Sequence, residues 1–596
     1  MNFDSKTVFA FILIGLILIL VQTPFYQKAF FPEAYRERQL QKTAETLKDT
    51  AADKSPQDGT VSPQEGRTGG QREGETQPGA VPVQSSPGEE IQPVEESRSF
   101  IRPLQVEGER EREINIETDL VLATLNTRGA VVEQWILKEY PGPGGRPVHL
   151  LPQDSEGALS VGFITPEGDT LDTSDWLFSS ASGTKVEVSD QATVRFQADL
   201  PTGGRLVKEY RFTTGTYHVN LSVTLENMQS IVSEKLFFIS ANSGLASTEQ
   251  RLRDDMYYAK AAISASADVN KGYKANGNVY RETGDIDWIG VRTKYFALVL
   301  APMDQKGAYG RIFGEEIPVS ADGKEKWKHY RIRLAMPYLG KRTEKNQFLV
   351  FLGPLDTGVV KSYGLGISKF MDFGWKIIEP FSRAVLWSFK KLHSIIPNYG
   401  LVIIIFSILI KIIVYPLTHK SFESMKKMQA LQPEMAKLRE QYAKDPQRLN
   451  RETMKLYKKS GVNPMGSCLP MMLQMPLLYA LFIVFRSTIE LRGQGFIWWI
   501  KDLSQPDTIA TLPFSIPFYG DSVNILPLFM GTTMLLQQKM SVTDPKQKFM
   551  IYFMPIFFTL LFNSFPSGLN LYYALFNLLS ILQQKYMVRS PGMKKS

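Results

Sequence analysis

Lys411 is the one charged residue in the apolar run 401–417, which has the length of a membrane helix. An ammonium group near the bilayer centre costs at least about 2.5 to 3.5 kcal/mol, so a charge at that depth marks a candidate functional site. The alternative is that the side chain snorkels to the nearer membrane surface at Leu417. However, Cα–Cβ bonds tilt towards a helix's N-terminus, which directs this side chain away from Leu417.

Polar residues also recur inside the other apolar segments. The five segments of the C-terminal half are 401–417, 469–485, 525–536 with its flanks, 549–565 and 569–586. Ser407 lies one helical turn before Lys411, and Gln474 lies inside the second segment. The last segment carries a polar stripe at spacings of three and four, made of Asn570, Tyr573, Asn577, Ser580 and Gln584. Such groups are expensive facing lipid, so we expect them to face one another or water.

The role of these polar groups depends on the charge balance of the helices. Hydrogen bonds between helices, worth about 0.6 kcal/mol each, would explain isolated Ser and Thr residues. They would not explain Lys411, because none of the five segments contains an aspartate or glutamate to neutralise it. The sequence therefore predicts a hydrated, positively charged cavity that attracts acidic residues of a passing chain.

Metal binding and covalent catalysis are not expected. The single cysteine, Cys468, excludes an intrachain disulfide, and the five histidines are scattered without a CxxC or HExxH pattern. We expect no cofactor and no enzymatic activity.

Composition divides the chain into segments. We expect an uncleaved N-terminal membrane anchor at 1–28, a disordered linker at 29–110 and an antiparallel β-sandwich domain at 111–355. An amphipathic helix at 373–397 suits the membrane interface, although a core helix of the β domain has the same pattern. A five-helix core at 398–587 includes a two-helix hairpin at 418–467, and a basic tail at 588–596 follows.

The distribution of lysine and arginine predicts the orientation of the six spans. The hairpin 418–467, the loop 537–548 and the tail are rich in basic residues, which places all three and both termini in the cytoplasm and the β domain outside. The methionine stripe of the hairpin suits either packing between its two helices or an adaptable surface for apolar partners.

Four stretches resemble the YidC family of membrane protein insertases. They are MQALQPEMAKLRE at 428–440, KLYKKSGVNP at 455–464, CLPMMLQMP at 468–476 and FPSGLNLYY at 565–573. The resemblance implies a bacterial inner-membrane protein with a periplasmic β domain and a groove open to the cytoplasm. It aligns the charge of that groove with Lys411, and substrate contacts with Ser407 and Tyr573. The family usually has arginine where this chain has Lys411, so a bidentate contact is not expected, whereas electrostatic attraction is.

We therefore expect an insertase without a chemical step, whose groove is lined by Lys411, Ser407, Gln474, Tyr573 and Asn577. The implied partners are nascent membrane proteins, the Sec translocon and membrane lipids, with a ribosome as a further candidate. Two alternatives remain at this stage: a secondary transporter of a small anion, which would usually show internal repeats, and an exported sugar-binding or sugar-modifying enzyme.

Overall fold

The computed structural model describes residues 103–104, 110–153, 155–320, 322–323, 325–462, 469–516, 519–541 and 548–589. The anchor expected at 1–28, almost all of the linker and the tail beyond 589 lie outside these residues. Residues 433–460 belong to one compact unit, and the other described residues belong to a second. The two units are described separately.

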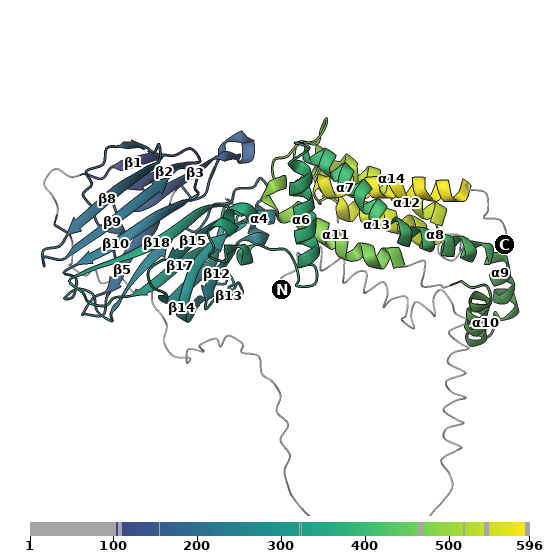
Figure 1. Cartoon of the computed structure of the whole chain (residues 1–596), viewed down its shortest axis with the longest axis horizontal. Helices are drawn as coiled ribbons and strands as arrows, with labels where there is room; N and C mark the ends of the chain where they lie inside the picture. Colours follow the sequence, from purple (N-terminus) through teal and green to yellow (C-terminus); the bar gives the residue numbers. More distant parts are fainter. Residues whose placement is uncertain are drawn as a thin grey trace, which may run out of the picture. The chain divides into compact units, whose positions relative to one another are not determined.

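The β domain consists of eighteen strands in one hydrogen-bonded network (Figure 1). The strands are β1 Glu113–Glu117, β2 Val121–Asn126, β3 Val131–Pro141, β4 Pro147–His149, β5 Ala158–Ile164, β6 Thr170–Asp172, β7 Lys185–Glu187, β8 Gln191–Asp199, β9 Arg205–Thr213, β10 His218–Glu226, β11 Leu236–Ala241, β12 Lys260–Ala265, β13 Asp268–Asn270, β14 Val279–Arg292, β15 Phe296–Pro302, β16 Gly307–Pro318, β17 Lys326–Pro337 and β18 Thr343–Pro354.

Two runs of strands face each other across the hydrophobic core. One run is β8-β9-β10-β18-β15 and the other is β1-β2-β3-β5-β11-β17-β16, and the long strand β14 pairs with both β15 and β16. Trp135 of β3 stacks on Phe212 of β9 between the runs. The expected antiparallel pattern needs one correction, because β1 and β7 pair in parallel. A bend at residues 189–190 separates β7 from β8.

Lys208 of β9 lies in the centre of this core and is fully buried. Its ammonium donates to the carbonyl oxygens of Gly129, Ala130 and Leu159 at 3.0, 2.5 and 2.8 Å. Burial lowers the pKa of Lys208 to about 7, whereas three carbonyl acceptors favour the charged form. The Lys208 ammonium therefore connects two backbone segments of unusual conformation, since Ala130 and Leu159 have positive φ angles of 46° and 74°.

We expect Lys208→Met to lower the free energy of unfolding by roughly 2 to 4 kcal/mol, because it removes the ammonium donor from three buried carbonyl groups, of which that of Ala130 keeps the Tyr210 hydroxyl as a donor. The measurement is thermal unfolding of the purified chain, followed by the circular dichroism of its strands. Lys326→Met, at an exposed position of β17, is the matched control and should change little. Equal transitions for the two variants would contradict the assigned role.

The helices follow the β domain in the sequence. They are α5 Thr357–Ser362, α6 Glu379–His393, α7 Tyr399–Ile413, α8 Tyr415–Ala430, α11 Leu469–Ser487, α12 Ile525–Ser541, α13 Lys548–Phe562 and α14 Ser567–Arg589. A short helix, α4 Leu252–Tyr258, lies inside the β domain, and a two-stranded hairpin of β19 Thr508–Ile516 and β20 Gly520–Asn524 precedes α12. Helix α14 packs against α7 and α12, and α12 packs against α13.

The apolar run 401–417 is not one straight helix, contrary to the prediction. Helix α7 ends at Ile413, and the chain turns by 63° into α8. Pro416 explains the break, because it has no N–H to donate and its ring clashes with the preceding turn. Among the helices in the described ranges, none is by itself long and apolar enough to cross a membrane, whereas α7 and α8 meet that requirement as a bent pair.

The amphipathic helix is shorter than the predicted segment 373–397. It starts at Glu379, where Pro380 occupies the first turn and needs no hydrogen-bond partner for its nitrogen. Its buried face, with Ser382, Val385 and Phe389, packs on α7 and α11. Trp387 on the other side is exposed. Figure 1 shows α6 crossing the bundle helices rather than running along them.

The segment predicted as a two-helix hairpin contains the end of α8 and two further helices, α9 Gln432–Gln441 and α10 Pro446–Lys459. The break between α9 and α10 lies at residues 442–445. Asp445 caps α10 by accepting a hydrogen bond from the Arg448 backbone N–H at 2.9 Å, and Pro446 follows in the first turn.

Candidate functional site

Lys411 lies in the last turn of α7, five residues before Pro416 in the first turn of α8. Its side chain does not extend to solvent, because only 8% of the residue is exposed. The ammonium donates to the Ser580 hydroxyl of α14 at 2.7 Å and lies 4.5 Å from the centre of the Phe576 ring. Snorkelling is therefore not the arrangement observed.

The ammonium of Lys411 is under-satisfied in this position. Ser580 is the only hydrogen-bond acceptor that the described residues offer it, and an ammonium group has three donors. The Ser580 hydroxyl donates in turn to the Phe576 carbonyl oxygen at 2.7 Å. No carboxylate exists in the five apolar segments to pair with the charge. Two donors of Lys411 thus remain available to water or to an acidic group from outside.

The Ser and Thr hydroxyl groups of the helices donate hydrogen bonds mainly within their own helices. Ser407 is fully buried, but its hydroxyl donates to the Ile403 carbonyl oxygen of its own helix at 2.7 Å. Thr418, Thr532, Thr533 and Thr559 do the same. These hydroxyl groups donate locally, as Ser and Thr often do in apolar surroundings. Thr418 and Thr533 in addition accept hydrogen bonds from Gln583 and Asn577 of α14, at 3.2 and 3.5 Å, and so link that helix to α8 and α12. Ser407 shares the face of Lys411 without contacting it.

The other predicted residues occupy separate positions along the bundle. Asn577 of α14 donates from its amide to the Thr533 hydroxyl of α12 at 3.5 Å, so it faces α12 rather than Lys411. Tyr573 packs edge-on against Phe562 of α13, and its buried hydroxyl has no hydrogen-bond partner among the described residues. Gln474 is half-buried on α11.

The structure therefore places Lys411 against Ser580 where α7 packs on α14. It does not bring the five predicted residues together at one site. The acceptor of the Lys411 hydrogen bond is Ser580, a member of the predicted stripe that was not assigned to the groove. The signal was present in the sequence, because Ser580 lies three residues after Asn577 on the same helical face.

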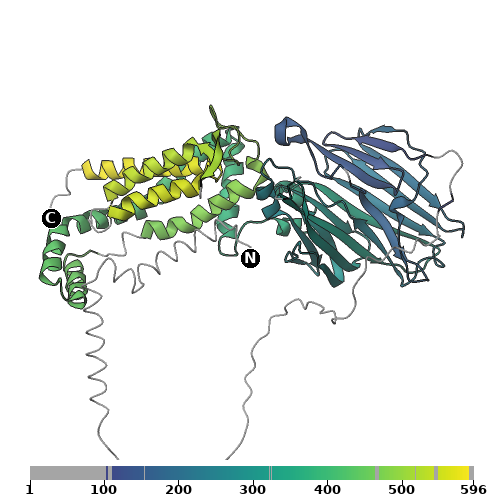
Figure 2. The same ribbon diagram turned by 180° about the vertical axis from the view of Figure 1, so that it is seen from behind.

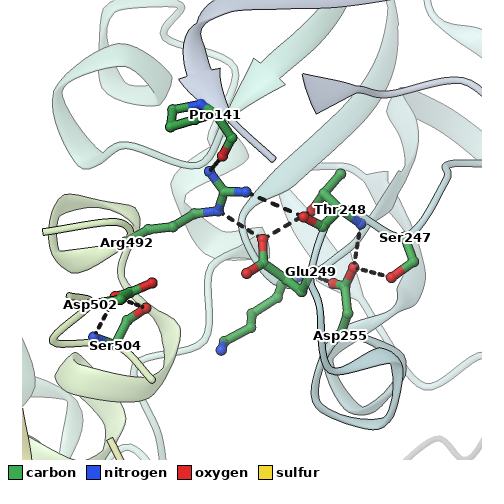
Figure 3. A network of polar contacts seen from close by, with 9 residues as sticks. Pro141, Ser247, Thr248, Glu249, Asp255, Arg492, Asp502 and Ser504 are labelled. Carbon is green, nitrogen blue, oxygen red and sulfur yellow. Dashed lines mark hydrogen bonds and ion pairs between the residues drawn. The ribbon is translucent and has the colours of Figure 1, made fainter. Parts of the chain in front are cut away.

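A second polar centre joins the loop after α11 to the β domain (Figure 3). Arg492 follows the 3₁₀ turn Ile489–Leu491, and its Nε donates to Glu249 at 2.7 Å. Its two terminal nitrogens donate to the carbonyl oxygens of Pro141 and Thr248 at 2.7 and 3.2 Å. Both charged side chains are more than nine-tenths buried. One guanidinium thus holds two separate loops of the β domain.

Asp255 stabilises the backbone next to Glu249, the carboxylate that accepts from Arg492. Its carboxylate accepts from the Ser247 hydroxyl and from the backbone N–H groups of Thr248 and Lys294, at 2.8 to 2.9 Å. Burial raises the pKa of both Asp255 and Glu249, while Arg492 opposes the rise at Glu249. No short motif predicts this centre, because Arg492 and Glu249 are separated by 243 residues in the sequence.

Further ion pairs continue the contact between the β domain and the helices. Arg486 at the end of α11 lies 3.2 Å from Asp254. Lys390 of α6 bridges Asp356, which follows β18, and Glu490, at 3.0 and 3.1 Å. Burial raises the pKa of Glu490 to about 7, with the nearby Asp356 charge contributing. The helices and the β domain therefore share a continuous polar interface.

Comparisons with known proteins cover both parts of the chain. The family model described as 60Kd inner membrane protein matches residues 391–595, and the model described as YidC periplasmic domain matches residues 113–384. The "Membrane protein insertase YidC" of Chlorobium phaeovibrioides is 36% identical over 508 residues, covering 83% of this chain and 86% of the relative. The protein of the same name from Chloroherpeton thalassium is 35% identical over 518 residues, covering 83% and 87%. A solved structure of an active YidC insertase shares 19% identity with a TM-score of 0.35, covering 82% of this chain and 94% of that one.

Proposed function

This chain belongs to the YidC family of membrane protein insertases, as the sequence motifs predicted, and we propose that the contact between α7 and α14 is where it receives its substrates. The protein acts in the membrane on nascent membrane proteins and catalyses no chemical reaction. The observation that supports the proposal is the ammonium of Lys411, which is buried among apolar helices with one hydrogen-bond acceptor.

The electrostatic step follows from that ammonium. Two charges 4 Å apart attract by about 4 kcal/mol at an effective dielectric constant of 20. An aspartate or glutamate in a substrate tail would gain that attraction at Lys411 and would supply the acceptor that the ammonium lacks. The apolar segment of the substrate would meanwhile remain in lipid beside α7 and α14. The polar tail thus crosses only part of the hydrocarbon layer on its own.

Ser407, Gln474, Tyr573 and Asn577 have supporting roles in this proposal. The unpaired hydroxyl of Tyr573 and the half-buried amide of Gln474 offer polar groups to water or to the passing tail. Ser407 and Asn577 are already bonded to protein atoms, so we assign them to the packing of the polar face.

The proposed topology follows from the charge distribution. The basic segments 418–467 and 537–548 lie in the cytoplasm together with both termini, and the β domain lies in the periplasm. The hairpin region then meets the incoming chain first. Cooperation with the Sec translocon, and docking of a ribosome on the basic segments, belong to the same proposal.

The test is reconstitution of the purified full-length chain in liposomes. A short single-span protein with an acidic N-terminal tail is added during its synthesis, and protease protection measures how much of the tail crosses the membrane. We expect clear protection with the protein and little in empty liposomes. Equal protection in both would contradict insertion by this protein on its own.

A further inference from the structure

In the hairpin β19–β20, between the loop after α11 and helix α12, both faces of β19 are exposed, whereas β20 is half-buried except for the exposed Asp521 and the buried Asn524. The hairpin forms its own two-stranded sheet, apart from the large sheet of the β domain. In β19 every residue is exposed except Leu512, which is half-buried. A two-stranded hairpin is at best marginally stable in water, so this one needs support from elsewhere.

Asp507 fixes one end of the hairpin to the bundle. One oxygen of its carboxylate accepts from the backbone N–H groups of Ile525 and Leu526, at 3.1 and 2.8 Å, and thereby caps the start of α12. The same oxygen accepts from the Trp499 indole N–H at 3.0 Å. The residue before β19 is thus tied to the helix that follows β20.

Asn563, just after α13, fixes the other strand. Its side-chain amide donates to the carbonyl oxygens of Tyr519 and Ser522, at 2.9 and 2.7 Å. Its own side-chain oxygen accepts from the amide of Asn524, at the end of β20, at 3.0 Å. The hairpin is therefore held at the start of α12 and the end of α13, although both faces of β19 are bare.

The bare faces carry apolar side chains and almost no charge. Residues 508–520 include no charged residue, and Asp521 follows at the start of β20. Phe514 is 61% exposed, and Ile509 and Ile516 are exposed as well. Trp498, which stacks on Trp499 beside the hairpin base, is 84% exposed. Uncharged surfaces rich in aromatic residues are typical of the membrane–water interface.

The direction of the hairpin agrees with an interfacial position. In Figures 1 and 2 the yellow-green hairpin runs across the bundle helices, not along them. Nine strand residues extend about 30 Å, whereas side chains of interfacial segments enter the membrane by about 5 to 10 Å. Only a hairpin that lies along the membrane plane can keep all its apolar residues at that depth.

We propose that the hairpin formed by β19 and β20, together with Trp498, lies in the lipid interface at the start of α12 and the end of α13. Lipid headgroups and the upper acyl chains cover its bare faces, and the hairpin sets the depth of these two helices in the bilayer. A partner strand is the weaker candidate, because Pro513 removes a donor from the edge of β19 and edge prolines disfavour added strands.

The test places a nitroxide spin label at Phe514→Cys in a chain whose single cysteine is changed by Cys468→Ala. The protein is reconstituted in vesicles of phosphatidylethanolamine and phosphatidylglycerol, and the accessibility of the label to oxygen and to a water-soluble nickel chelate is measured. Phe529→Cys on α12 is the reference for lipid, and Leu339→Cys, exposed in the β domain, is the reference for water. We expect the ratio of oxygen to nickel accessibility at Phe514 to approach that at Phe529.

Two results would overturn the proposal. A ratio equal to that at Leu339 would mean that water covers the hairpin, and low accessibility to both reagents would mean that protein covers it. A photoreactive benzophenone residue at position 514, in the chain that keeps Cys468, gives an independent measurement. We expect adducts with lipid, and adducts with protein alone would contradict the inference.

Discussion

Lys411→Met is expected to reduce the insertion of a substrate with an acidic tail by more than about tenfold, because an attraction of about 4 kcal/mol is lost and 1.4 kcal/mol corresponds to a factor of ten. Methionine keeps the length and apolar stem of the side chain, so the packing on Phe576 is largely preserved. Lys411→Arg should retain most of the activity, because it keeps the charge. The measurement is the protease-protection assay in liposomes.

Two controls separate charge from packing. Lys326→Met removes the same charge from an exposed position of β17, outside the proposed binding region, and should leave insertion unchanged. A substrate whose acidic residues are replaced by asparagine and glutamine should insert equally well with wild type and Lys411→Met. If the neutral substrate is impaired to the same degree, Lys411 acts through the structure of the bundle, and the electrostatic step is wrong.

The position of Lys411 shows what the sequence could reveal. A charge without a carboxylate in any of the five segments indicated a special role, and the stripe on 569–586 contained its partner, Ser580. Both signals are local, since they depend on composition and helical periodicity. The bend after Ile413 was also encoded, by Pro416, but an apolar pattern alone does not reveal whether a proline ends a membrane helix or only kinks it.

The β domain shows the same limit at a larger scale. The sequence predicted an antiparallel β-sandwich at 111–355, and strands such as β9 and β10 lie in that range and pair antiparallel. The parallel pairing of β1 with β7, and the burial of Lys208 beneath three carbonyl groups, depend on contacts between segments far apart in the chain. On an alternating strand, Lys208 lies at an inward position where periodicity favours an apolar residue, so periodicity predicts the position but not how the charge is satisfied.

The second large effect is expected at the contact between the β domain and the loop after α11. Arg492→Met removes the guanidinium from Glu249 and leaves a carboxylate buried without its partner, a change that typically costs 3 to 5 kcal/mol. We expect faster hydrogen–deuterium exchange of the backbone amides at 247–255 and 489–507, measured on the full-length chain in detergent. Arg253→Met, at an exposed position of α4, is the matched control and should leave the exchange unchanged.

The double variant Arg492→Met with Glu249→Gln distinguishes a buried ion pair from a simple loss of packing. Glutamine carries no charge, so the combination should be less destabilised than Arg492→Met alone, although it contains one more substitution. The carbonyl groups of Pro141 and Thr248 remain without a donor in both variants, so the recovery should be partial. If the two substitutions were additive, the guanidinium would act mainly through those carbonyl groups and the aromatic rings around it. In either case the loop that follows α11 depends on the β domain for its position, and the β domain thereby supports one end of the helix that carries Gln474.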